Sequence, residues 1–145
     1  MYKRILLAYD GSESGQKALL DGQEFADLTR SEVYLVAVMP PPSALVGGEG
    51  SIYDARLEEE EKKEFQSILE EGLRRLVASG HAAKGELLMG DAVDEIVNYA
   101  KKVGADLIVV GHKHLDRWIA RWWRGSLSKS LIENAPCNVL VVITR

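Results

Sequence analysis

Residues 91–111 read DAVDEIVNYAKKVGADLIVVG and join a helix directly to a buried strand. From Asp91 to Lys102 the apolar side chains recur at helical spacing on one face, at Val93, Ile96, Val97 and Ala100. Gly104 is a typical helix stop. The run Asp106–Val110 is apolar without alternation, which is typical of a strand covered on both faces. This stretch therefore predicts one helix–strand unit of a parallel sheet.

The same alternation of strand and helix extends outward along the chain. Four more strands are predicted at Arg4–Tyr9, Val33–Met39, Gly85–Met89 and Asn138–Ile143, the third of them weak enough to be an edge strand. Three more helices are predicted at Ser14–Thr29, Ala55–Ser79 and Ser126–Asn134. The apolar stripe expected for the second of these comprises Leu57, Phe65, Ile68, Leu69, Leu73 and Leu76. We predict an α/β fold of one domain, residues 1–145, with a single doubly wound, Rossmann-like five-stranded parallel sheet and helices on both faces.

Composition excludes several classes of protein. The net charge is −4, so the basic excess typical of a DNA-binding domain is missing. No apolar run approaches the roughly 20 residues of a membrane helix, and the apolar stretch at the N-terminus is too short for a signal peptide. The single cysteine, Cys137, can form neither an internal disulfide nor a cysteine-based zinc site. We expect a cytoplasmic protein that binds neither DNA nor membrane.

The predicted fold also indicates where a ligand binds. Open parallel sheets bind ligands beyond the carboxyl ends of the strands, where the strand order reverses. The segments after strands one, two and four are Asp10–Ser14, Met39–Asp54 and Gly111–Ser126. The second of these includes an insert, Pro40–Asp54, that is long for a compact domain and is more typical of a functional loop.

Two motifs in these segments suggest nucleotide chemistry. Gly125 and Ser126 begin the last predicted helix, whose free N–H groups and positive dipole end favour an anion such as phosphate. Asp10 follows the first buried strand, where its carboxylate can accept hydrogen bonds from ribose hydroxyls or an adenine amine. Each motif has an ordinary alternative, because Gly-Ser is common at helix starts and Asp-Gly-Ser is a common capping turn.

Three longer stretches are together similar to the universal stress protein family. They read RILLAYDGSESGQKAL from residue 4, LMGDAVDEIVNYAKKVGADLIVVG from residue 88 and RGSLSKSLIENAPCNVLVVI from residue 124. The resemblance implies a five-stranded parallel α/β sheet, a homodimer joined through the last strand and, in one branch of the family, bound AMP or ATP, the latter with or without magnesium.

The resemblance also implies which residues hold the nucleotide. Asp10 and Val38 match positions that hold adenosine, and Gly111, Gly125, Ser126 and Leu127 match positions around ribose and phosphates. With their neighbours, the predicted nucleotide-binding set is Ala8, Tyr9, Asp10, Val38, Met39, Val110, Gly111, His112, His114, Arg124, Gly125, Ser126, Leu127 and Ser128.

The sequence departs from the pattern of the nucleotide-binding branch, which is G-x-x-G, nine residues, then G-[ST]. His114 replaces the second glycine and ten residues precede Gly125. We therefore expect AMP to bind at least as well as ATP, and more tightly as the pH drops through about 6.5 and the imidazole gains charge. Gly15 stands where the family often carries serine, a smaller departure.

A third feature leaves alternatives open. Residues 113–124 hold all three tryptophans, Trp118, Trp122 and Trp123, among several basic residues. This segment either packs over the nucleotide or, in a nucleotide-free protein-interaction module, docks an unknown protein partner. No catalytic arrangement is readable, and the spacing of His112 and His114 alone does not make a metal site. Slow ATP hydrolysis is the single enzymatic candidate.

The composition of the last predicted strand, NVLVVI, leads to a prediction about the oligomeric state. An apolar, uncharged strand left bare at a sheet edge invites aggregation. We expect it to pair antiparallel with its own copy about a two-fold axis, burying Val139 and Val141 or their alternates.

Overall fold

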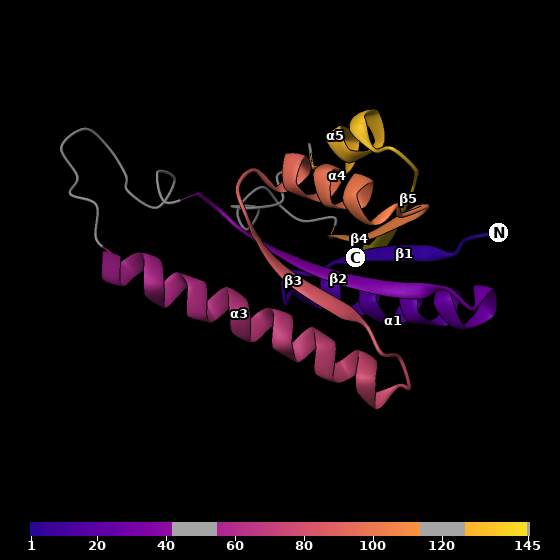
Figure 1. The fold of residues 1–145 in the computed structure, drawn as a ribbon, viewed down its shortest axis with the longest axis horizontal. Helices are drawn as coiled ribbons and strands as arrows, with labels where there is room; N and C mark the ends of the chain where they lie inside the picture. Colours follow the sequence, from indigo (N-terminus) through magenta and orange to yellow (C-terminus); the bar gives the residue numbers. More distant parts are fainter. Residues whose placement is uncertain (42–54, 114–126, 145) are drawn as a thin grey trace.

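A five-stranded parallel sheet forms the centre of the fold, as predicted (Figure 1). The computed structural model describes residues 1–41, 55–113 and 127–144. The strand order is β3-β2-β1-β4-β5, and every neighbouring pair is parallel. The strands are β1 (Arg4–Ala8), β2 (Glu32–Met39), β3 (Lys84–Met89), β4 (Leu107–Lys113) and β5 (Asn138–Thr144). The weak third strand lies at an edge, as expected.

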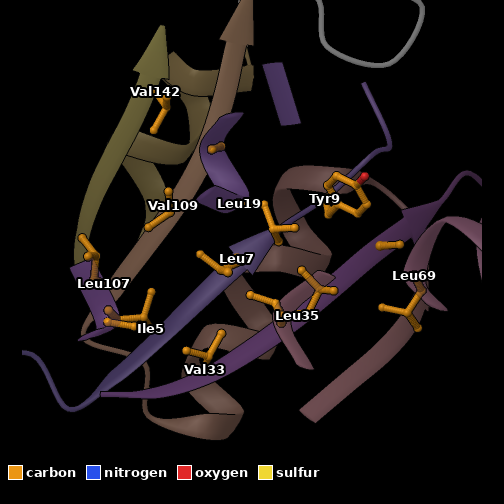
Figure 2. Packing of buried hydrophobic residues seen from close by; sticks show 14 residues of the cluster. Ile5, Leu7, Tyr9, Leu19, Val33, Leu35, Leu69, Leu107, Val109 and Val142 are labelled. Carbon is orange, nitrogen blue, oxygen red and sulfur yellow. The ribbon is translucent and has the colours of Figure 1, made fainter. Parts of the chain in front are cut away.

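Four helices cover the two faces of this sheet (Figure 1). They are α1 (Glu13–Thr29), α3 (Ala55–Ala78), α4 (Ala92–Val103) and α5 (Leu127–Asn134). Two buried clusters separate the faces, one beneath α1 and α3 and one beneath α4 and α5. Successive residues of a strand point to opposite faces; Leu6 therefore belongs to the α4/α5 cluster, whereas Ile5 and Leu7 belong to the α1/α3 cluster (Figure 2).

Local signals place the helix ends. Ser12 is the N-cap of α1, and its side chain accepts a hydrogen bond from the Gly15 amide. Asp91 caps α4 in the same way, through the Asp94 amide. The predicted stop at Gly104 is confirmed, since it ends α4 in the left-handed conformation, with φ of 67°.

Some boundaries differ from prediction because of tertiary packing. β1 ends at Ala8, one residue early, and β4 continues to Lys113 because β5 pairs with it over its whole length. Leu57 was expected on the buried stripe of α3 but is 55% exposed. The reason is that the first turns of α3 extend past the carboxyl end of the sheet (Figure 1), so that its buried residues, Leu69, Gly72 and Leu76, lie in its second half.

The strand order reverses between β1, the central strand, and its neighbour β4. From β1 the chain moves outward to β2 and β3, and from β4 it moves outward on the other side to β5. The carboxyl ends of β1 and β4 therefore lie side by side at the switch point where ligands of such sheets bind. Among the described residues no helix is long and apolar enough to cross a membrane.

Candidate functional site

The structure brings part of the predicted site together on one side of the switch point. Ala8, Val38 and Val110 belong to, or pack against, the cluster beneath α4 and α5. His112 follows Val110 by two residues in β4 and so shares its side of the sheet. α5 covers the same face through Leu131. Residues from three strands and one helix thus converge at the carboxyl end of the sheet.

Asp10 lies directly beyond β1, and its carboxylate closes a turn. Its Oδ1 accepts hydrogen bonds from the Ser12 amide at 2.9 Å and from the Ser12 hydroxyl at 2.5 Å. The Ser12 Oγ in turn accepts from the Gly15 amide at 3.0 Å. The helix cap is therefore Ser12, and Asp10 orients that cap. No described residue donates a hydrogen bond to the second oxygen of Asp10, which leaves this half of the carboxylate able to accept one from a ligand.

Gly111 has a packing role that the sequence did not reveal. A Cβ built on Gly111 would lie 2.3 Å from the carbonyl oxygen of Ser14 and 2.9 Å from the backbone nitrogen of Gly15. Since both neighbours are backbone, neither can move without shifting α1. The glycine therefore allows β4 to approach the first turn of α1 closely, whatever it contributes to phosphate binding.

Four predicted site residues have buried side chains: Ala8 and Val110 in the α4/α5 cluster, and two others, Met39 and Tyr9. Met39 is fully buried, and Tyr9 is 2% exposed within the α1/α3 cluster (Figure 2). The Tyr9 hydroxyl donates to Glu71 Oε1 on α3 at 3.3 Å. Burial, with the negative charge of Glu71, raises the pKa of Tyr9 to about 12. At these four positions a ligand can therefore reach main-chain atoms only.

The first turn of α5 carries an unusual polar atom. Ser128 Oγ is shielded from solvent and has no hydrogen-bond partner among the described residues. Buried hydroxyls normally find a partner, and one without any is often completed by a ligand. Leu127 opens the same helix. The other predicted residues, His114, Arg124, Gly125 and Ser126, lie outside the described residues, as does the tryptophan-rich segment from residue 114 onward.

Sequence reasoning missed two residues that shape this site. A Cβ on Gly15 would lie 2.6 Å from Asp10 Oδ1, so this glycine makes room for the carboxylate. The only feature of the sequence that pointed to Gly15 was that it stands where the family often carries serine. Glu71 holds the Tyr9 hydroxyl from a position 62 residues away in the chain, and no local pattern marks such a contact. The described residues contain no group of three potential metal ligands.

Comparison with known proteins agrees with this arrangement. The model of the universal stress protein family matches residues 1–142. The chain belongs to the universal stress protein family. A universal stress protein of Methanocaldococcus jannaschii is 33% identical over 143 residues, covering 98% of this chain and 82% of the relative. One from Thermus aquaticus is 34% identical over 146 residues, covering 98% of this chain and 99% of the relative.

Solved structures of the family share the fold. The crystal structure of a universal stress protein in complex with cAMP superposes with a TM-score of 0.73 at 25% identity, covering 99% of each chain. The expected family and the doubly wound fold are thus confirmed.

Proposed function

We propose that this universal stress protein binds an adenine nucleotide at the switch point between β1 and β4. The observation that carries the proposal is the Asp10 carboxylate at the end of β1, with one oxygen that no described residue engages. A carboxylate there can accept hydrogen bonds from ribose hydroxyls or from the adenine amine. The cAMP complex of a family member supports an adenine nucleotide as the class of ligand.

Three further features fit a nucleoside in this position. The side chain of Val38 is only partly buried and provides an apolar surface on the α4/α5 side, which suits the flat face of a base. The beginning of α5 offers backbone N–H groups to a phosphate, since the first amides of a helix have no partner within it. The unpartnered Ser128 hydroxyl lies in that same turn and can donate to a phosphate oxygen. The residues at hand thus match base, sugar and phosphate in turn.

Within this class of ligand, we propose that AMP binds at least as well as ATP. The helix start can hold one phosphate without any help from residue 114. His114 and the lengthened segment before Gly125 replace the second glycine and the spacing of the nucleotide-binding branch, on which the outer phosphates depend. Titration of AMP, ADP and ATP with magnesium at two pH values tests this. A tenfold preference for ATP at both values contradicts it.

Substitution of Asp10 tests the proposed site itself. Asp10→Ala is expected to weaken AMP binding by about 1.5–3 kcal/mol, roughly 10- to 150-fold, as for the loss of one hydrogen bond to a charged group. Calorimetric titration measures the change. Asp21→Ala serves as the control, because Asp21 lies on α1, pairs with Lys17 at 2.9 Å and is remote from the switch point. Equal AMP affinity in wild type and Asp10→Ala would assign Asp10 to the turn alone.

We also propose that the protein is a homodimer joined through β5. Both sheet edges, β3 and β5, lack a neighbouring strand among the described residues. β3 carries the charged side chains Lys84 and Glu86, which discourage edge pairing, whereas β5 reads NVLVVIT and has no charge. An uncharged edge of this kind is well suited to pair with its own copy about a two-fold axis.

A further inference from the structure

The Asp10 carboxylate is folded back onto the first turn of α1. Oδ1 accepts two hydrogen bonds from Ser12, one from its amide and one from its hydroxyl. The positive end of the α1 dipole adds a favourable interaction with the negative charge. The Oδ1 half of this charged group is therefore satisfied by its own chain.

This pose requires that residue 15 has no side chain. A Cβ on Gly15 would lie 2.6 Å from Asp10 Oδ1, closer than real Cβ contacts allow. The same Cβ would lie 3.2 Å from Ser12 Oγ and 3.4 Å from Tyr9 Cδ2, distances that small shifts can accommodate. An alanine at position 15 would therefore leave the helix in place and move the carboxylate, because the end of an aspartate side chain is free to rotate.

The pose also ties Oδ1 of the carboxylate to the first turn of α1. α1 lies on the same face as the cluster that contains Tyr9, whereas Ala8, Val38 and Val110 pack toward α4 and α5. A ligand on the α4/α5 side must draw Asp10 off Ser12 in order to engage it fully. Each hydrogen bond that the ligand gains from Oδ1 then replaces one that the protein loses, and this exchange lowers the net gain.

We propose that Gly15 attenuates nucleotide binding by allowing Asp10 to bond to Ser12 in the free protein. This inference rests on the proposed function and deepens it, since Gly15 becomes a positioning residue that acts through Asp10. Gly15→Ala excludes the folded-back pose and leaves the carboxylate available. We expect AMP to bind about fivefold more tightly to Gly15→Ala than to wild type.

A double-mutant cycle separates this effect from a general change in α1. The four proteins are wild type, Gly15→Ala, Asp10→Ala and the double variant, each titrated with AMP by calorimetry. If Gly15 acts through Asp10, the gain in affinity disappears in the Asp10→Ala background. Gly22→Ala is the matched control, because it is the same substitution in the same helix but its Cβ would meet Leu7 Cδ2 instead. It should leave AMP affinity unchanged.

A second measurement reports the pose without any nucleotide. The Ser12 amide donates to Asp10 Oδ1 in wild type, so its hydrogen exchange should be faster in Gly15→Ala. Unchanged exchange at Ser12, or AMP affinity in Gly15→Ala that is equal to or weaker than wild type, overturns the inference. If neither the wild type nor any variant binds AMP, the proposed function fails as well. If the wild type binds AMP and Gly15→Ala binds it with the same affinity, this inference alone is contradicted.

Discussion

Tyr9 links the end of β1 to α3 through a single buried hydroxyl. Its ring packs under α3 at Gly72, where an added Cβ would lie 2.8 Å from Tyr9 Cδ1. Its hydroxyl donates a hydrogen bond to Glu71, the residue before Gly72 in the helix. Arg75 donates to the same Glu71 oxygen at 2.9 Å, so the carboxylate is shared between a buried and an exposed partner. Because Tyr9 precedes Asp10, this contact ties the residue before the candidate site to the helix layer.

The raised pKa of Tyr9 predicts a stability change at alkaline pH. The unfolded chain loses this proton near pH 10, whereas the folded protein keeps it until about pH 12. Since the folded state holds more protons in this window, the contribution of Tyr9 is fully present below pH 10 and is lost as the pH rises to 12. It amounts to roughly 2–3 kcal/mol.

Urea unfolding of wild type and Tyr9→Phe across pH 8 to 12 measures this contribution. Below pH 10 the variant should be less stable by about 1 kcal/mol, because it lacks the hydrogen bond to Glu71. Above pH 10 the difference should shrink and then reverse, because phenylalanine has no proton to hold. A difference that stays constant over the whole range contradicts the assignment.

At the scale of elements, the contact between β4 and the start of α1 positions the two halves of the site. Gly111 brings the strand against the backbone of Ser14 and Gly15, and the turn before that helix holds Asp10. The carboxyl end of β4 and the carboxylate after β1 are therefore held together by one close backbone contact. Any side chain at position 111 must push these two elements apart.

Gly111→Ala is expected to destabilise the protein by about 2–3 kcal/mol, the usual range for overpacking against atoms that cannot move. Gly85→Ala is the matched control, because Gly85 also lies in a strand but its Cβ would meet the end of the flexible Leu73 side chain, at 2.7 Å. We expect it to cost less than about 1 kcal/mol. Urea unfolding compares the two variants, and an equal loss in both would show that the backbone contact at Gly111 is not special.

At the scale of the whole molecule, the two edges of the sheet have opposite characters. α3 covers the β2 and β3 side, and the exposed residues of β3 include charged ones. On the other side, β4 is the one described strand that pairs with β5, and β5 exposes Ile143, which is 52% accessible. An apolar edge that is paired with a second copy would be protected from less specific association.

Ile143→Lys is expected to convert the proposed dimer to a monomer, because a charge on an edge strand opposes pairing with another strand. Light scattering at micromolar concentration measures the mass of each protein. Val77→Lys serves as the control, since Val77 is 64% exposed on α3, which contacts β2 and β3 at the opposite edge. Wild type that is already monomeric at this concentration would contradict the dimer.

The sequence alone predicted the order of elements, the parallel sheet and the ends of the strands at which a ligand binds. These features depend on periodicity and on capping residues, which neighbouring positions encode locally. The stripes of α1 and α4 and the stop at Gly104 could be predicted for that reason. The stripe of α3 was predicted too far toward its start, since Leu57 is exposed where the helix extends past the sheet.

Only the tertiary structure decided how the residues of the candidate site are used. Tyr9 was a candidate by position, but packing against α3 buries its side chain and pairs it with Glu71. Gly111 was a candidate for contact with ribose and phosphates, and folding gives it a packing role as well, since its Cβ would meet the backbone of Ser14. Asp10 turned toward Ser12 because Gly15 leaves space above the helix. Such contacts join residues that the chain brings together only on folding, so their geometry follows from packing and not from local pattern.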